Sequence, residues 1–308
     1  MKKVLLNVKL TDDQLNKFKA VSDELVFTDD LNDLDVEIMI GDYKPQTLIN
    51  YPNLKLLMST SVGYDAYIKK GILNKQTVLC NAVDVHTEEV AEHMFALMIE
   101  MVKNLEIYRD NQAKHLWHDE GKVKSLSDLR VAVIGLGNIG KHVAKLCKAL
   151  GMYVIGVKRQ MIDKPDYIDE LFLNSDLEKA VSDVDVVLSV LPGTKENVHL
   201  FTLDLFKKMK PDTILINAGR GNLIDTDVLY EVLDKKIIKA IGQDVFEKEP
   251  LPEDSKLWDL KNLVITPHMA GFFHLDKARE KYVDICAENL RRYLNNEELL
   301  NVVSERED

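Results

Sequence analysis

Short apolar runs alternate with amphipathic segments along most of the 308 residues. Continuous apolar runs predict buried strands, whereas apolar residues at helical spacing predict helices with one buried face. The expected strands cover 3–8, 36–40, 54–59, 77–81, 131–134, 153–157, 184–191, 213–217, 240–245 and 263–266, and the expected helices cover 12–22, 88–104, 141–150 and 277–293. Thr11 is the expected N-cap of the first helix. Because strands alternate with helices, we expect an α/β architecture with parallel sheets.

The segment 131–150 combines a buried strand, a glycine turn and a helix. Gly135, Gly137 and Gly140 follow the strand with the spacing G-x-G-x-x-G. In this motif the first glycine permits a tight turn, the second lets a pyrophosphate approach the backbone, and the third allows the helix to pack closely on the strand. The first helical turn offers N–H groups and a positive dipole end to phosphates. We interpret the segment as a dinucleotide-binding turn, although strand–helix turns without a ligand show the same spacing.

A polar stretch at 115–127 separates two successive α/β series. The chain is long enough for two domains, each with its own core. We therefore expect two Rossmann-like, doubly wound parallel sheets. The nucleotide-binding domain is expected at 103–274, inserted into a flavodoxin-like substrate-binding domain built from 1–102 and 275–308. The cleft between two such domains is the expected place for the site.

Composition narrows the classes of partner. Apolar residues make up 46% and charged residues 30% of the chain, as in ordinary soluble proteins, and the net charge of −11 argues against nucleic acid. The N-terminal apolar segment is too short, and is followed by polar residues too early, for a signal peptide. No apolar stretch approaches the ~20 residues that span a bilayer. We therefore expect a cytoplasmic protein without a membrane partner. Cys80, Cys147 and Cys286 lie far apart in apolar runs, which predicts buried reduced thiols and no metal site.

The end of the second strand after the glycine turn indicates which dinucleotide is bound. NAD sites normally carry an acidic residue about 20 residues beyond the first glycine, to accept from the ribose 2′-hydroxyl. Lys158, Arg159 and Gln160 occupy this position and include no carboxylate. Arg159 can bind a 2′-phosphate bidentately and Lys158 adds a second positive charge, although both can also be solvated surface cations. The pair favours NADP(H), with NAD(H) as the alternative.

Three later loops carry residues suited to the chemistry of 2-oxo acids. Arg220, Glu249 and His268 each follow a strand of the second series, and ends of parallel strands meet at one edge of a sheet. A 2-oxo acid needs a cation for its carboxylate and carbonyl, and a proton donor for its oxygen. A carboxylate beside the histidine would orient the ring and favour the imidazolium. Taken singly, the three residues also fit a loop salt bridge, a turn residue before a proline and an ordinary loop histidine.

The stretches GLGNIG, NAGRGNLID, DVFEKEPLP and ITPHMAG resemble, in order and spacing, the signatures of the D-2-hydroxyacid dehydrogenase family. The resemblance covers nearly the whole chain. It implies that Arg220 binds and polarises the substrate, that His268 is the general acid/base and that Glu249 is its partner. Glu247 is the competing acid two residues earlier, but the family's partner directly precedes the proline, as Glu249 does.

The same resemblance implies further contacts. The loop 59–65 is similar to the family loop that holds the substrate carboxylate, here through N–H groups of Val62 and Gly63. His86 and Thr87 either line the cleft or have surface and capping roles, and the helix after them helps to form a dimer in the family, so we expect a homodimer. The residues implied to contact the cofactor are Gly135, Gly137, Asn138, Ile139, Gly140, Lys158, Arg159, Leu191, Pro192, Asn197, Ala218, Gly219, Arg220, Asp244, His268, Ala270 and Gly271, with Asp244 at the nicotinamide end.

Two departures from the family pattern stand out. Asn197 occupies a position where threonine is common, and Phe272-Phe273 are bulkier than the usual small residues, so that they either narrow the substrate pocket or pack between domains. The pattern is closest to glyoxylate/hydroxypyruvate reductases, which implies NAD(P)H-dependent reduction of a small 2-oxo acid to the D-2-hydroxy acid. Formate dehydrogenases carry Gln where Glu249 stands. The alternatives from other classes are a nucleotide-sensing corepressor-like protein and an inactive structural paralogue.

Overall fold

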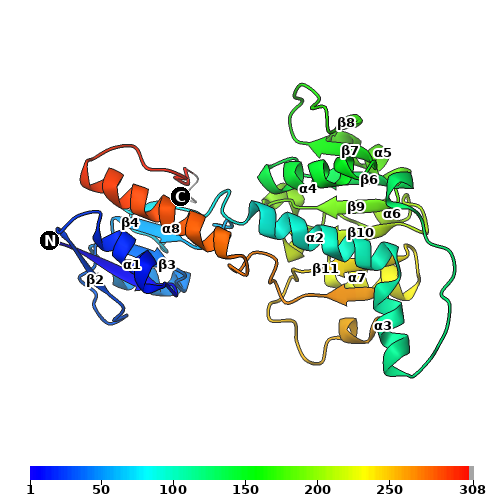
Figure 1. The fold of residues 1–308 in the computed structure, drawn as a ribbon, viewed down its shortest axis with the longest axis horizontal. Coiled ribbons are helices and arrows are strands. Elements are labelled where there is room, and N and C mark those ends of the chain that lie inside the picture. Colours follow the sequence, from blue (N-terminus) through cyan, green and yellow to red (C-terminus); the bar gives the residue numbers. More distant parts are fainter. Residues whose placement is uncertain (305–308) are drawn as a thin grey trace. The chain divides into compact units, whose positions relative to one another are not determined.

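The computed structural model describes residues 1–304, and the chain divides into two compact units. The first unit comprises Met1–His86 and the chain from Phe273 onward, and the second unit comprises Thr87–Phe272. The second unit is thus an insertion in the first, as the colours along the ribbon show (Figure 1). No helix within residues 1–304 is both long enough and apolar enough to span a bilayer.

The first unit is built on a five-stranded parallel sheet. Its strand order is β2-β1-β3-β4-β5, the flavodoxin-like order. The strands are β1 (Lys2–Asn7), β2 (Leu25–Thr28), β3 (Ile38–Gly41), β4 (Leu56–Ser59) and β5 (Val78–Cys80). Helices α1 (Asp12–Lys19) and α8 (Asp276–Leu294) pack on one face, and the short helix η1 (Pro45–Asn50) and neighbouring loops cover the other. Thr11 caps α1 in a reciprocal capping box with Gln14, as the sequence predicts.

The second unit is built on a seven-stranded parallel sheet of order β12-β11-β10-β9-β6-β7-β8. The strands are β6 (Arg130–Ile134), β7 (Tyr153–Lys158), β8 (Glu170–Leu173), β9 (Val186–Ser189), β10 (Ile214–Asn217), β11 (Ala240–Gln243) and β12 (Leu263–Ile265). The chain order reverses between β6 and β9, where doubly wound sheets open a ligand crevice at the carboxyl ends of their strands. This arrangement confirms the predicted fold class.

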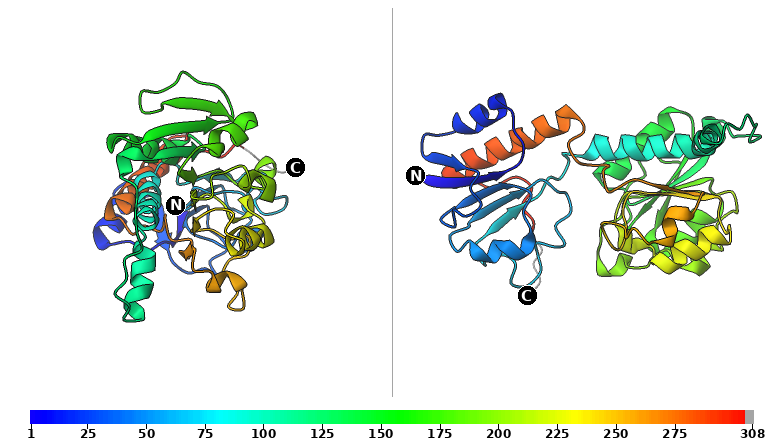
Figure 2. Two further views of the ribbon diagram at one scale, coloured as in Figure 1. Left: turned by 90° about the vertical axis from the view of Figure 1, so that its right-hand side faces the viewer. Right: turned by 90° about the horizontal axis from the view of Figure 1, so that it is seen from below.

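Helices lie on both faces of the larger sheet (Figure 2). Those on one face are α2 (Thr87–Val102) and α4 (Asn138–Ala149), and those on the other are α5 (Leu177–Ser182), α6 (Leu203–Phe206) and α7 (Thr226–Asp234). Successive side chains of each strand point to opposite faces of the sheet, so each strand contributes to the apolar core on both faces. Val131 and Val133 of β6 face α2 and α4, while Ala132 and Ile134 face the helices on the other side. The cysteines are buried free thiols, as expected.

The unit boundaries differ from the expected ones by the length of one helix. The sequence predicted a border at 102/103, whereas the compact unit begins at Thr87. The reason is that the apolar face of α2, including Met94, Met98 and Met101, packs against the sheet of the second unit. The chain returns to the first unit at Phe273 rather than at 275.

Two strands and four α-helices of residues 1–304 were not predicted: β2, β8, α3 (Leu105–Ala113), α5, α6 and α7. Both strands are four residues long and lie at sheet edges, so fewer of their side chains are buried. Helix α3 buries little apolar surface and therefore has a weak amphipathic pattern.

Candidate active site

The glycine turn forms a tight cradle at the start of α4. Gly135 has φ +99°, which L side chains rarely adopt, and a Cβ on Gly140 would overlap the carbonyl oxygen of Gly135. The space in front of Gly137, the N-cap of α4, is open to at least 4 Å. The first-turn N–H groups from Asn138 to Gly140 have no partner within the helix and suit an anion. The cradle therefore fits the pyrophosphate of a dinucleotide.

The loops after β9 and β10 pack directly beside this turn. A Cβ on Gly135 would lie 3.2 Å from Leu191 Cδ2, and a Cβ on Gly219 would lie 2.6 Å from the Leu191 carbonyl oxygen. Glycine at these two positions thus permits a close approach of the three loops. Asn197 is buried and donates to the Pro192 carbonyl oxygen at 2.8 Å, so its amide group supports the loop after β9.

Lys158 and Arg159 lie at the end of β7, the strand that pairs with β6 ahead of the glycine turn. The backbone N–H of Gly135 donates to Val157 in β7, and Lys158 Nζ lies 3.4 Å from the carbonyl oxygen of Leu136. Arg159 follows as an exposed residue. The structure thus brings Lys158 to the glycine turn, where its ammonium group is directed toward the backbone of the turn.

His268 and Glu249 form a hydrogen-bonded pair. His268 Nδ1 lies 2.7 Å from Glu249 Oε2, and Glu249 Oε1 accepts from the Phe246 N–H at 2.8 Å. The hydrogen bond to Glu249 raises the pKa of His268 above its ordinary value, against the opposing effect of burial. Burial by itself would raise the pKa of Glu249, but the hydrogen bonds from His268 and Phe246 lower it below its ordinary value. Both effects favour an imidazolium beside a carboxylate.

The competing acid, Glu247, faces a different histidine. Its Oε1 lies 2.7 Å from His199 Nε2, and its Oε2 accepts from Thr226 N and Oγ1 at the start of α7. Within residues 1–304, His199, Asp225 and Glu247 form the group of histidine and carboxylate side chains close enough to offer one ion three ligands, within 4.8 Å of one another. The second carboxylate oxygens of Glu247 and Asp225 accept from backbone N–H groups at the start of α7. The positive dipole at this end of the helix disfavours a bound cation.

Arg220 follows β10 on a loop whose shape depends on Asn217. The fully buried Asn217 accepts from Gly219 N and donates to Arg220 O, both at 3.1 Å. Arg220 Nη1 donates to Gly219 O at 2.8 Å. The charge of Arg220 opposes the raised pKa of His268 and contributes to the lowered pKa of Glu249, so Arg220 is close enough to act electrostatically on both. Sequence reasoning did not identify Asn217 as the support of this loop.

Asp244 anchors the loop that carries His268. Its backbone carbonyl oxygen accepts from His268 N at 2.7 Å, and its carboxylate accepts from Thr266 Oγ1, Met269 N and Ala270 N at 2.6, 3.0 and 3.3 Å. Asp244 as a whole is 1% exposed. Asp244 therefore organises the loop that carries His268, a role that the sequence did not predict beside its expected nicotinamide contact.

In the first unit, the loop after β4 is held through its carbonyl groups. Ser61 O accepts from Ala82 N at 2.9 Å, and Val62 O accepts from Asn81 Nδ2 at 2.7 Å. In a planar trans peptide the N–H group points away from the C=O group. The N–H groups of Val62 and Gly63 therefore point away from these two partners.

These features agree with the comparisons with known proteins. The profile described as "D-isomer specific 2-hydroxyacid dehydrogenase, NAD binding domain" matches residues 95–270. Glyoxylate/hydroxypyruvate reductase B of Pectobacterium atrosepticum is 33% identical over 242 residues, which are 76% of this chain and 74% of that protein. The chain belongs to the D-isomer specific 2-hydroxyacid dehydrogenase family. The family and the enzyme class implied by the sequence are thus confirmed.

Two solved structures extend the similarity over the whole chain. A D-isomer specific 2-hydroxyacid dehydrogenase family protein from Aeromonas salmonicida is 28% identical, with a TM-score of 0.85 over 98% of this chain and 99% of that one. D-lactate dehydrogenase from Aquifex aeolicus, complexed with NAD and lactic acid, is 26% identical, with a TM-score of 0.80 over 99% and 100%. The chain is an NAD(P)-dependent oxidoreductase that interconverts 2-oxo and 2-hydroxy acids.

The two phenylalanines that depart from the family pattern have separate surroundings. Phe272 is 61% exposed, and its ring lies nearly perpendicular to the His268 ring, with centroids 6.2 Å apart. Phe273, in the first unit, packs against His86 at 4.7 Å and Tyr282 at 5.4 Å. His86 Nε2 also lies 2.9 Å from Thr60 O, in the loop after β4. Phe272 is thus the member of the pair that neighbours His268.

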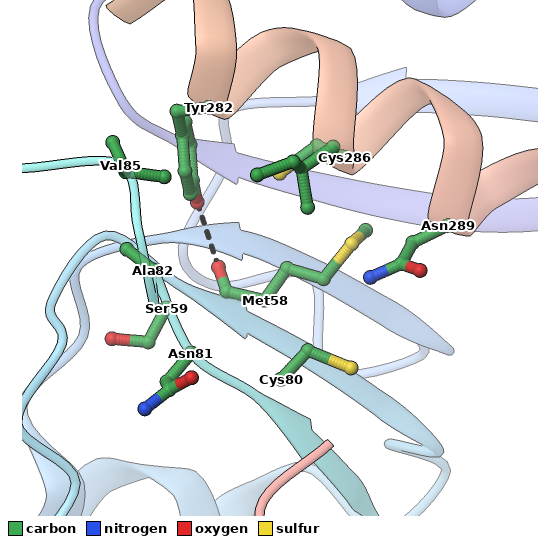
Figure 3. Close-up of a pocket in the computed structure, with 10 residues that line it drawn as sticks. Met58, Ser59, Cys80, Asn81, Ala82, Val85, Tyr282, Cys286 and Asn289 are labelled. Atoms are coloured by element: carbon green, nitrogen blue, oxygen red, sulfur yellow. Dashed lines mark hydrogen bonds between the residues drawn. The ribbon is translucent and has the colours of Figure 1, made fainter. Parts of the chain in front are cut away.

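A small pocket lies between α8 and the ends of β4 and β5 (Figure 3). Tyr282 closes one side by donating to the Met58 carbonyl oxygen at 2.8 Å, and the thiols of Cys80 and Cys286 line it. Burial raises the pKa of Cys80 to about 12 and that of Cys286 further, so both thiols remain protonated. The lining identifies the pocket as a packing gap of the dehydrogenase rather than a reactive site.

Proposed function

We propose that this dehydrogenase reduces a small 2-oxo acid of the glyoxylate or hydroxypyruvate type to the D-2-hydroxy acid, with His268 as the proton donor. The observation that carries the proposal is the 2.7 Å pair of His268 Nδ1 and Glu249. The hydrogen bond to Glu249 occupies Nδ1 of the His268 ring. The proton on Nε2 of the imidazolium is therefore the one that is donated to the substrate. Arg220 acts on both members and supplies the positive charge for the substrate.

Each residue has one task in this mechanism. The glycine cradle would hold NAD(P)H, which would supply the hydride to the carbonyl carbon of the 2-oxo acid. Arg220 binds the carboxylate and the carbonyl oxygen, and N–H groups of Val62 and Gly63 hold the carboxylate. His268 protonates the oxygen as negative charge develops on it, and Glu249 stabilises the cation beforehand. In the direction of oxidation the neutral His268 accepts the proton back.

The test is a panel of 2-oxo acids, with loss of NADPH or NADH absorbance as the readout. Glyoxylate, hydroxypyruvate and pyruvate are compared with larger 2-oxo acids, and the product is analysed for the D-isomer. Replacing His268 by Ala should reduce turnover by about 10²–10⁴-fold, the usual contribution of a general acid, and leave cofactor binding intact. Tight cofactor binding without turnover of any substrate would favour a nucleotide-sensing role instead.

NADP(H) is the proposed cofactor, because Lys158 and Arg159 stand where an NAD site carries a carboxylate. Calorimetric titration should give a lower Kd for NADPH than for NADH. Replacing Arg159 by Ala should reduce that difference about tenfold, as expected for the loss of one charge-assisted contact. Equal affinities for the two cofactors in the unmodified protein would contradict this assignment.

We also propose that the protein is a homodimer that uses α3 and the segment after it. Leu105 and Leu116 are about half exposed there, and Trp117 is fully exposed. Large apolar side chains gathered on a surface indicate an interface. Light scattering should give twice the chain mass, and Trp117→Lys should shift the mass toward the monomer. A monomeric unmodified protein would exclude the dimer.

A further inference from the structure

Helix α2 presents an imidazole to the strand ends that carry the active site. His93 Nε2 lies 3.1 Å from Thr266 Oγ1 and 3.7 Å from Asp244 Oδ1. The His93 side chain is 18% exposed and that of Asp244 is 2% exposed. All three residues belong to the second unit, so the contact lies within one compact body.

The chemistry of these groups fixes the direction of their hydrogen bonds. The Thr266 hydroxyl carries one proton, and it donates this proton to Asp244 Oδ1 at 2.6 Å, because an ionised carboxylate only accepts. The Thr266 oxygen therefore accepts from His93, whose Nε2 carries a proton. The result is a directed chain from His93 through Thr266 to Asp244.

Asp244 is the anchor of the loop that carries His268. Besides Thr266, it accepts from the backbone N–H groups of His268, Met269 and Ala270. His268 itself has φ +51°, in the left-handed region that non-glycine residues rarely adopt, so the loop depends on these anchors to keep its shape.

We propose that His93 is a positioning residue for the acid/base histidine. Its Nε2–H group fixes the Thr266 hydroxyl on Asp244, and Asp244 in turn sets the direction in which His268 faces the substrate. The inference rests on the proposed role of His268 as proton donor. It gives α2 a part in catalysis, although no atom of His93 needs to touch the substrate.

Two variants test the proposal. His93→Phe keeps a ring but removes the donor, whereas His93→Gln keeps an amide N–H donor. We expect the Phe variant to lower kcat about five- to tenfold, the rate equivalent of one lost hydrogen bond, with a KM for NADPH within about twofold of the unmodified value. The Gln variant should recover most of the loss. His142→Phe, on the neighbouring helix α4, is the matched control and should retain full kcat.

Hydrogen exchange gives a readout that does not depend on activity. Mass spectrometry of a peptide that contains residues 266–271 should show faster amide exchange in His93→Phe but not in His93→Gln or His142→Phe. A His93→Phe variant with unmodified kcat and exchange would overturn the proposal, as would a loss of kcat with unchanged exchange. If the unmodified enzyme reduces no 2-oxo acid, the proposed function fails, and the exchange result still decides whether His93 orders the loop.

Discussion

Replacing Glu249 by Gln tests whether its carboxylate keeps His268 protonated. Gln has nearly the same size but no charge. A hydrogen bond between charged groups contributes about 1.5–3 kcal/mol. The two side chains are 35% and 47% exposed, so solvent screening reduces the contribution here to about 1–2 kcal/mol. If the transition state depends on this interaction, kcat should fall about five- to thirtyfold.

The pH dependence gives the sharper result. The hydrogen bond from Glu249 raises the pKa of His268, so the imidazolium that donates the proton persists to higher pH. Without the carboxylate, the alkaline fall of kcat/KM for 2-oxo acid reduction should move to lower pH. The measurement is the pH profile of NADPH oxidation with glyoxylate, for the unmodified enzyme and for Glu249→Gln.

Glu247→Gln is the matched control, because Glu247 lies in the same loop but faces His199 and the start of α7. It should leave the pH profile unchanged and reduce the free energy of unfolding by about 0.5–2 kcal/mol, as for a lost helix cap. A profile that moves in Glu247→Gln and not in Glu249→Gln would assign the partner to Glu247. Unchanged profiles in both variants would refute the coupling of either acid to catalysis.

Three further substitutions test separate parts of the structure. Thr11→Ala should lower the free energy of unfolding by about 1 kcal/mol in urea denaturation, because it removes a helix cap. Gly140→Ala should abolish NADPH binding in calorimetry, since its Cβ overlaps Gly135. Phe272→Ala should raise kcat/KM for bulky 2-oxo acids relative to glyoxylate about tenfold, as expected from the apolar volume that it frees beside His268. An unchanged substrate preference would show that Phe272 does not restrict the substrate.

The sequence predicted the glycine cradle because its requirements are local. Gly135 needs a positive φ, and Gly140 must let α4 approach the backbone of the turn, so both requirements follow from neighbouring residues. The strands of both sheet centres were predicted for a similar reason, since a strand buried on both faces is a continuous apolar run. The edge strands β2 and β8 have a weaker signal because they are partly exposed.

Other features depend on contacts between distant residues. Glu247 and Glu249 lie on an irregular loop with no periodicity, so only the family resemblance favoured Glu249, and the structure shows a separate histidine for each. The supporting roles of Asn217 and Asp244 depend on which loops fold back over them. Likewise, the amphipathic pattern of α2 predicts a buried face but not the unit against which that face packs.

Phe272 and Phe273 show how the position of a unit boundary decides what neighbouring residues do. In the sequence they form a single pair of adjacent bulky residues, yet the boundary between the two units falls between them. Phe273 has φ +58°, and its ring packs within the first unit against His86 and Tyr282. Phe272 remains in the second unit, with its ring perpendicular to that of His268. Substrate preference should therefore respond to Phe272, whereas the stability of the first unit should respond to Phe273.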